Sequence, residues 1–202
     1  MIDAAEALTR LRDGNARFIA GQLTDQALSK REMKALATDQ APFAIILGCS
    51  DSRVPAELVF DQGFGDLFVI RVAGNIVAPS QVGSVEFAAA KFGTKLVVVM
   101  GHQSCGAITA AVEELLDGAK PESKNLSSIV DRVKPAVQAV IAGGKDMDRK
   151  SLIREAVRAN VRASVDHLRH GSALLEKLIR TDGLMIVGAK YSLDTGVVAF
   201  LD

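Results

Sequence analysis

Short apolar runs, separated by longer segments of helical periodicity, constrain this chain more than any other feature of its sequence. The runs lie at residues 43–47, 67–70, 96–100 and 184–187, and Val, Ile and Leu dominate them. Strands that are apolar on both faces are typical of a parallel sheet covered by helices on either side. The pattern predicts an α/β fold with a mainly parallel central sheet of four strands, helices on both faces, and an edge strand at residues 197–201.

Helix signals fill the segments between and around these runs. Asp3 with Glu6 three residues later predicts an N-terminal cap, although Gly14 leaves the end of that first helix open. Its apolar side must be buried on its own domain or on a neighbour. Further helices are predicted at residues 80–92, 107–116, 126–142 (kinked at Pro135), 153–168 and 172–180.

The charge balance and the length exclude several classes of protein. Lys plus Arg and Asp plus Glu each number 24 in 202 residues, so no net charge attracts nucleic acid or an anionic membrane surface. No apolar run is long enough to span a bilayer, and charges are dispersed through the first twenty residues. No linker or repeat divides the chain. We expect one domain over residues 1–202, in a cytoplasmic protein.

Polar clusters follow three of the predicted strands directly. They are Cys-Ser-Asp-Ser-Arg at 49–53, Gly-His-Gln-Ser-Cys-Gly at 101–106 and, more weakly, Arg-Val-Ala-Gly-Asn at 71–75. Ligands of open α/β sheets bind outside the carboxyl ends of the strands, where the chain order reverses. If the first and third strands are neighbours, both cysteines of the chain and one of its three histidines meet in one crevice.

Two thiolates and an imidazole form a donor set that suits zinc. His102 and Cys105 are close enough in sequence to come from one turn, and Cys105 opens a predicted helix whose amides favour its thiolate. Asp51 is either a fourth ligand or the partner of Arg53, which would leave the fourth position to water. Four protein ligands are typical of structural zinc, and three plus water are typical of catalytic zinc.

These residues also have ordinary structural interpretations. Buried free cysteine is common as a small hydrophobic residue, and a histidine after a strand is often only hydrogen-bonded. A disulfide between Cys49 and Cys105 is a further alternative. His167 and His170, near the end of a helix, are expected on a solvated face, with a proton-shuttle role as the minor alternative.

The two motifs together resemble the β-class carbonic anhydrases. The resemblance rests on Cys49-x-Asp51-x-Arg53 followed by His102-x-x-Cys105, and it extends from residues 14–18 to residues 191–196. It implies the β-carbonic anhydrase fold and reversible hydration of CO2 to bicarbonate and a proton, by attack of zinc-bound hydroxide.

The resemblance also implies roles for particular residues. Cys49, His102 and Cys105 would hold one Zn2+ per chain, and Asp51 would bind the metal only in a closed state. In the open state Asp51 would pair with Arg53 and accept a hydrogen bond from zinc-bound water. The implied substrate-binding residues are Gln40, Gly74, Phe87, Val77 and Phe60.

One branch of the family is inhibited by bicarbonate bound to a Trp–Arg–Tyr trio. Arg71 and Tyr191 could match two of its members, but Ile46 stands at the tryptophan position and the chain has no Trp. Together with Gln40, this favours the plant-type, non-allosteric branch. Val72 departs from the family pattern by replacing a polar residue, for which a local change in packing is expected.

Family resemblance further implies a homodimer or a dimer of dimers, with residues 1–40 as a helical arm that packs on the partner. Two other functions remain open at this stage. One is a carbon disulfide or carbonyl sulfide hydrolase, which shares the same metal motifs. The other is a non-catalytic zinc or redox protein with Asp51 always on the metal, against which the presence of Arg53 argues.

Overall fold

The computed structural model describes residues 2–25, 30–143 and 147–201. Its described part contains a five-stranded sheet in the order β2-β1-β3-β4-β5. The strands are β1 (Ala44–Gly48), β2 (Leu67–Arg71), β3 (Leu96–His102), β4 (Met185–Tyr191) and β5 (Val198–Leu201). β2, β1, β3 and β4 are parallel, and β5 pairs antiparallel with β4. The predicted four parallel strands and edge strand are thus confirmed.

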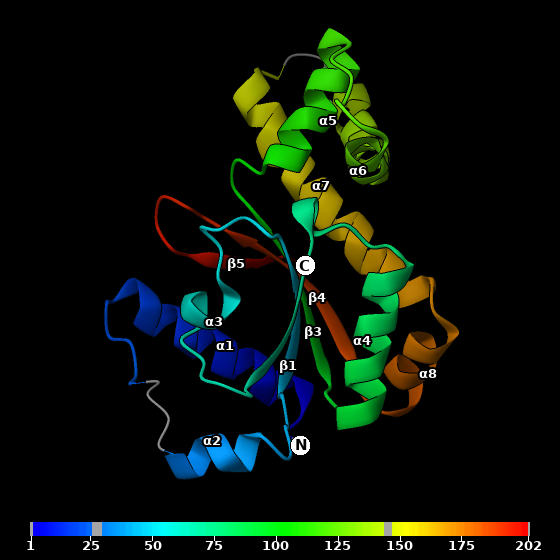
Figure 1. Ribbon diagram of the computed structural model, residues 1–202. Helices are drawn as coiled ribbons and strands as arrows, with labels where there is room; N and C mark the ends of the chain where they lie inside the picture. The colour runs from blue at the N-terminus through cyan, green and yellow to red at the C-terminus, as the bar shows by residue number, and fades with distance from the viewer. Residues whose placement is uncertain (1, 26–29, 144–146, 202) are drawn as a thin grey trace.

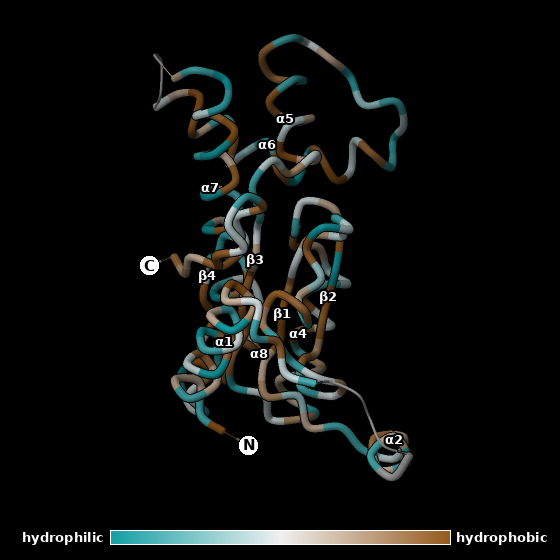
Figure 2. Tube along the Cα trace, turned by 90° about the vertical axis from the view of Figure 1, so that its left-hand side faces the viewer, coloured by the Kyte–Doolittle hydropathy of each residue, from teal (hydrophilic) through white to brown (hydrophobic). Residues whose placement is uncertain are grey.

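Successive residues of the central strands face opposite sides of the sheet. Ile46 and Val98 belong to the core on one side, and Leu47 and Val99 belong to the core on the other. Both faces are covered, which explains why the runs are apolar throughout. The hydrophobic colouring of Figure 2 accordingly gathers on the central strands.

Helices cover both faces of the sheet (Figure 1). α1 and α3 lie on one face, and α4, α7 and α8 pack on the other. The described helices are α1 (Ala4–Ile19), α2 (Lys30–Leu36), α3 (Ala56–Val59), α4 (Pro79–Phe92), α5 (Gly106–Asp117), α6 (Lys124–Gly143), α7 (Arg149–His170) and α8 (Ala173–Thr181), with a 3-10 turn η1 at Ala73–Asn75. α2, α3 and η1 are too short to carry a periodic signal, and the sequence analysis missed them. None of the helices in the described ranges is both long and apolar enough to cross a membrane.

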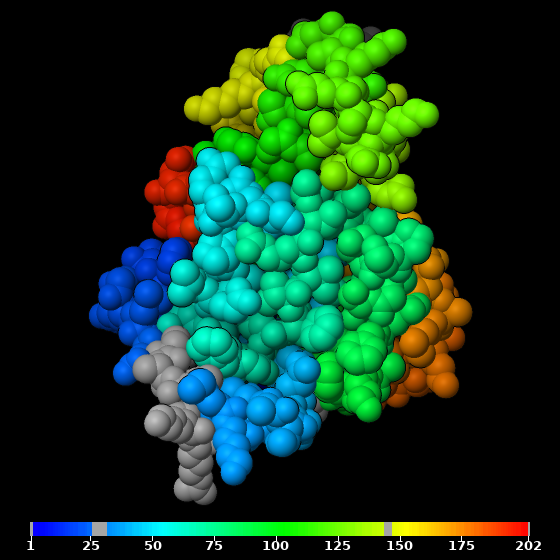
Figure 3. Space-filling view, in the orientation of Figure 1, coloured from blue at the N-terminus to red at the C-terminus, as the bar shows by residue number. Residues whose placement is uncertain are grey.

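α1 extends five residues past Gly14, the residue at which the sequence left the end of this helix open. α1 runs through Gly14, and a glycine stands there because the backbone at the end of α3 lies close: a Cβ on Gly14 would lie 1.8 Å from the carbonyl oxygen of Phe60. Ala7 and Leu11 of α1 are fully buried against the chain's own sheet. The buried face of α1 is thus covered within its own chain, and the expectation that residues 1–40 pack on a partner stays a prediction. α2 lies apart from the sheet at the base of the molecule (Figures 1 and 3).

α5 and α6 lie beyond the carboxyl ends of the strands (Figure 1). α6 continues through Pro135, which remains inside the helix. Together with part of α7, these helices enclose a third hydrophobic cluster, and this cluster includes both cysteines. The fold thus brings helix termini and strand ends together at one end of the sheet.

Candidate metal centre

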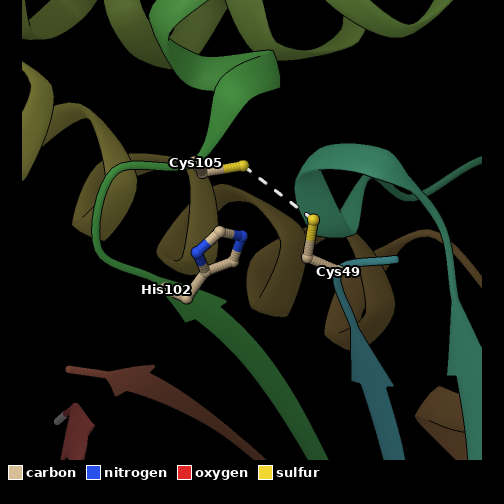
Figure 4. Close-up of side chains that lie close together, drawn as sticks. All are labelled: Cys49, His102 and Cys105. Atoms are coloured by element: carbon tan, nitrogen blue, oxygen red, sulfur yellow. Dashed lines mark hydrogen bonds between the residues drawn. The ribbon is translucent and has the colours of Figure 1, made fainter. Parts of the chain in front are cut away.

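Cys49, His102 and Cys105 come together where β1 and β3 end (Figure 4). Cys49 directly follows β1, His102 is the last residue of β3, and Cys105 is the N-cap of α5. Because β1 and β3 are neighbours in the sheet, their two loops meet as predicted. The ligand atoms all lie within 4.8 Å of one another, and the three residues are buried. We refer to these three residues as the Cys/His cluster.

The two thiols are free, and their sulfur atoms lie 4.0 Å apart in hydrogen-bond contact. The alternative of a disulfide is therefore wrong for this structure. The hydrogen bond from Cys105 lowers the pKa of the Cys49 thiol, whereas the contact with Cys49 and burial raise the pKa of the Cys105 thiol. The two thiols therefore share a hydrogen bond in which Cys49 is the more readily ionised sulfur.

Of the two ring nitrogens of His102, only Nδ1 makes a hydrogen bond to a described residue. Its Nδ1 lies 2.8 Å from the carbonyl oxygen of Gln103, and because a carbonyl can only accept, Nδ1–H is the donor. Nε2 is buried and has no hydrogen-bond partner among the described residues. Burial lowers the pKa of His102, but the contact with the Cys49 thiolate outweighs it and the net direction is upward. A histidine oriented through Nδ1 with a buried, unpartnered Nε2 is typical of a metal ligand, and the two thiols complete a donor set that fits zinc.

Asp51 faces Arg53 at the edge of the Cys/His cluster. The Arg53 Nε donates to Oδ1 at 2.9 Å and Nη2 donates to Oδ2 at 2.7 Å, while the Arg53 backbone amide also donates to Oδ1 at 3.0 Å. This hydrogen bonding holds the pKa of the Asp51 carboxyl well below its usual range. Oδ2 nevertheless lies 3.8 Å from Nε2 of His102. The sequence left two roles open for Asp51, a fourth ligand of the metal or the partner of Arg53. The structure shows the ion pair with Arg53.

Arg71 fixes the loop that carries Cys49 and Asp51. Its Nε donates to the Cys49 carbonyl at 3.0 Å, and its Nη2 donates to the Asp51 carbonyl at 2.7 Å. The sequence analysis considered Arg71 only as a possible match to the bicarbonate-binding trio. Its position at the end of β2, paired with Gly48 of β1, is the signal that could have indicated this bracing role.

Of the five predicted substrate-binding residues, Gly74 alone contacts the Cys/His cluster within the described part of this chain. Its backbone amide donates to Cys49 Sγ at 3.4 Å. Phe60 is fully buried in the core beneath α1, so it cannot line a cleft open to substrate, and that expectation is wrong. Val77 packs into the core on the side of α4, α7 and α8. Gln40 and Phe87 are exposed on the surface of the chain.

A cavity of about 440 Å³ lies beside the Cys/His cluster, between α5 and α6. Ala73 and Gly106, which line it, are the immediate neighbours of Gly74 and Cys105 in the chain. Seven of its ten other lining residues are small or apolar, and three are charged: Ala107, Ala110, Ala119, Pro121, Leu126, Ile129 and Val130, with Glu113, Lys120 and Glu122. Small residues carry no recognisable motif, and the sequence analysis therefore missed this lining. His167 and His170 are exposed on α7, as expected, and do not contribute to the cluster.

The chain is similar to known carbonic anhydrases over most of its length. A family model described as "Carbonic anhydrase" matches residues 44–198. Carbonic anhydrase 2 of Mycobacterium tuberculosis is 38% identical over 95% of this chain and 90% of the relative. A carbonic anhydrase of Pseudomonas aeruginosa is 34% identical over 95% of this chain and 88% of the relative. One of two tetrameric β-carbonic anhydrases of the ascomycete Sordaria macrospora superposes with a TM-score of 0.78 at 24% identity, covering 98% of this chain and 95% of that chain.

Proposed function

This chain belongs to the β-class carbonic anhydrases, and on that premise we propose that Cys49, His102 and Cys105 hold one zinc ion per chain while Asp51 and Arg53 serve the reaction beside it. The activity is the reversible hydration of CO2 to bicarbonate. The single observation that carries the assignment is the buried Cys/His cluster, whose His102 Nε2 lacks a hydrogen-bond partner among the described residues. Zinc held there would act as a Lewis acid and lower the pKa of a coordinated water molecule, which would supply a nucleophile.

The roles of the chain's own side chains follow from their contacts. Arg53 keeps Asp51 ionised and donates to both of its carboxylate oxygens. Oδ2 of Asp51 is then an acceptor close to the cluster, able to orient a proton of the attacking water. Arg71 keeps the Asp51 backbone in place during this step. The Gly74 amide stabilises the thiolate of Cys49.

Substrate contacts are proposed to come in part from a second copy of the chain. Gln40 and Phe87 are exposed and make no contact with the cluster of their own chain, so they can serve a cleft only across an interface. β2 is an edge strand of the described sheet, and exposed apolar side chains lie close to it: Leu58, Phe64 and Phe87. We therefore propose a homodimer formed along this face, or a dimer of two such dimers. Figure 3 views the molecule with the segment from β2 to α4 toward the reader.

The site is proposed to be of the open, plant-type branch. Ile46, at the tryptophan position of the bicarbonate-inhibited branch, is fully buried in the core. Arg71 directs two of its nitrogens at backbone carbonyls of the Cys49 loop, which supports a structural role for it. The unpaired thiols fit a reducing compartment, so a cytoplasmic location is part of the proposal.

Stopped-flow CO2 hydration on zinc-loaded protein, from neutral to alkaline pH, tests this function. The expected result is fast hydration that rises smoothly with pH, because two thiolates donate more charge to the metal than imidazoles do and keep the pKa of the coordinated water higher. Stoichiometric zinc without hydration at any pH would contradict the proposed role of the site. Carbon disulfide serves as the second substrate in the same assay.

A further inference from the structure

The turn that carries the Gly74 amide has an unfavourable backbone conformation. Gly74 has φ of 71° and the following Asn75 has φ of 44°, so two consecutive residues lie in the left-handed region. Non-glycine residues seldom adopt this region, and such a conformation persists only where the surrounding structure holds it. Within the turn itself, the Asn75 amide donates to the Val72 carbonyl at 3.1 Å. Contacts from outside must therefore maintain the turn.

Helix α7 provides these contacts. The Asn160 side chain donates from Nδ2 to the Gly74 carbonyl at 2.9 Å, and the Ser164 hydroxyl donates to the Asn75 carbonyl at 3.4 Å. Asn160 is 3% exposed, so its amide is shielded from water and its hydrogen bond is strengthened by the low local dielectric. The two residues lie one helical turn apart on the same face of α7, above the turn.

The turn also packs closely against α5, with little space beside Gly74. A Cβ on Gly74 would lie 2.9 Å from Cβ of Ala107, in the first turn of α5 just after Cys105. Residue 74 is thus confined between α5 and α7, with its carbonyl bound to Asn160 and its amide directed at Cys49 Sγ. Without the Asn160 side chain, the Gly74 carbonyl loses its hydrogen bond. The backbone that sets the orientation of the Gly74 amide is then held less firmly.

We propose that Asn160 is a positioning residue for the metal centre, which holds Gly74 so that its amide donates to the Cys49 thiolate. The inference rests on the proposed zinc site and deepens it. Removing such an outer hydrogen bond typically weakens metal binding about tenfold to a hundredfold. Asn160 donates to the Gly74 carbonyl, so its effect on the metal centre passes through Gly74.

The test measures zinc affinity by chelator competition in the wild type, Asn160→Ala and Asn160→Leu. The leucine variant keeps most of the side-chain volume and removes only the donor. We expect the zinc affinity of both variants to be at least about tenfold lower than that of the wild type. In the cobalt-substituted protein, we expect the thiolate-to-cobalt charge-transfer band to shift, because the Cys49 sulfur has lost a hydrogen bond. A residue that only maintains the fold would not move this band.

Asn15→Ala is the matched control. Asn15 is also a buried helical asparagine, 5% exposed, and it donates to the carbonyls of Val59 and Gly196 at 3.0 and 2.9 Å, away from the Cys/His cluster. This variant should lower the free energy of unfolding as the Asn160 variants do, yet leave zinc affinity and the cobalt band unchanged.

The outcomes separate the inference from the proposed function. Absence of stoichiometric zinc in the wild type would refute the zinc site itself. Equal zinc affinity in the wild type and the Asn160 variants would refute the positioning role and leave the zinc site intact. If neither Asn160 variant folds, Ser164→Ala decides, because it removes the weaker 3.4 Å contact to the same turn. A smaller weakening in the same direction supports the inference, and an unchanged affinity overturns it.

Discussion

Asp51 and Arg53 form a two-pronged ion pair at the rim of the Cys/His cluster, with nitrogen–oxygen distances of 2.9 and 2.7 Å. The same Asp51 carboxylate lies 3.8 Å from Nε2 of His102. The Asp51 carboxylate therefore lies between Arg53, in its own loop, and His102, one of the residues proposed to bind zinc. Its pairing with Arg53 is the observation that fits the open site proposed above.

Replacing Asp51 by alanine should separate catalysis from metal binding. The three cluster residues remain, so zinc should stay at one per chain, while loss of the oriented acceptor should reduce CO2 hydration by at least about a hundredfold. Metal analysis and stopped-flow hydration on the same sample check both parts. Full activity in Asp51→Ala would remove Asp51 from the mechanism.

The pH dependence of the Asp51 carboxyl follows from its lowered pKa. A carboxyl whose folded pKa is depressed contributes stability that is fully present above its ordinary pKa of about 4 and is lost as pH falls through the folded value. The difference in unfolding free energy between wild type and Asp51→Asn should thus be constant from pH 5 to 8, a range chosen to lie above that ordinary pKa, and shrink in stronger acid. In Arg53→Ala the Asp51 titration, followed by carboxyl NMR, should move up toward the ordinary range. A titration unaffected by Arg53→Ala would show that the ion pair does not set the pKa.

The histidines offer an internal comparison for the metal site. His102→Ala should lose stoichiometric zinc, because it removes a proposed ligand atom, Nε2, which is buried and has no hydrogen-bond partner among the described residues. His170→Ala should keep zinc at one per chain, since the His170 side chain is 72% exposed on α7. Atomic absorption after dialysis measures both. Zinc retained equally in both variants would contradict the ligand assignment.

Two glycines in helices should respond to alanine in opposite directions. Gly14→Ala should destabilise the protein by about 1–3 kcal/mol, because its Cβ would overlap the Phe60 carbonyl oxygen, a backbone atom that cannot move freely. Gly83→Ala in α4 should stabilise it by about 0.5–1 kcal/mol, because no atom lies within 4 Å of the added Cβ and alanine favours the helix. Urea unfolding measures both changes, and a neutral Gly14→Ala would show that α1 and α3 are not held in close contact.

The proposed dimer face can be tested at Phe87. This side chain is 53% exposed and packs edge-on against Phe92 with a centroid separation of 5.6 Å. Phe87→Glu would place a charge on the proposed interface, and we expect it to shift the protein toward monomer in sedimentation velocity experiments. Leu116→Glu, at an exposed leucine near the end of α5, is the control and should leave the oligomer unchanged. A wild-type monomer would contradict the proposal outright.

The parallel sheet could be predicted because its signal is local. A run such as Leu96 to Met100, apolar on both faces, is stable only between two covering layers, and the structure buries every residue of it. The Cys/His cluster could be predicted because its members directly follow strands and parallel strands end at the same edge. Short elements such as α3 escaped prediction, since four residues are too few to show a period.

Two of the predicted substrate-binding residues show what the sequence could not specify. Phe60 and Phe87 are both phenylalanines in apolar surroundings, and nothing local distinguishes a core residue from a surface one. The packing of α1 onto the sheet buries Phe60 completely, and the position of Phe87 on the outer side of α4 leaves it exposed. Side-chain exposure depends on which elements pack together, which neighbouring residues in the chain do not specify.

Residue type and spacing were enough to predict the strands and the longer helices, the strand-end placement of both cysteines and His102, and the donor chemistry that suits zinc. These properties depend on a few neighbouring positions. The pairing of Asp51 with Arg53, the hydrogen bonds from Arg71 to the Cys49 loop, and the hydrogen bond from Asn160 to a turn 86 residues away became visible in the folded chain. Such choices depend on hydrogen-bond geometry between distant segments, and that geometry exists only after the sheet order and the packing of α7 have brought the segments together.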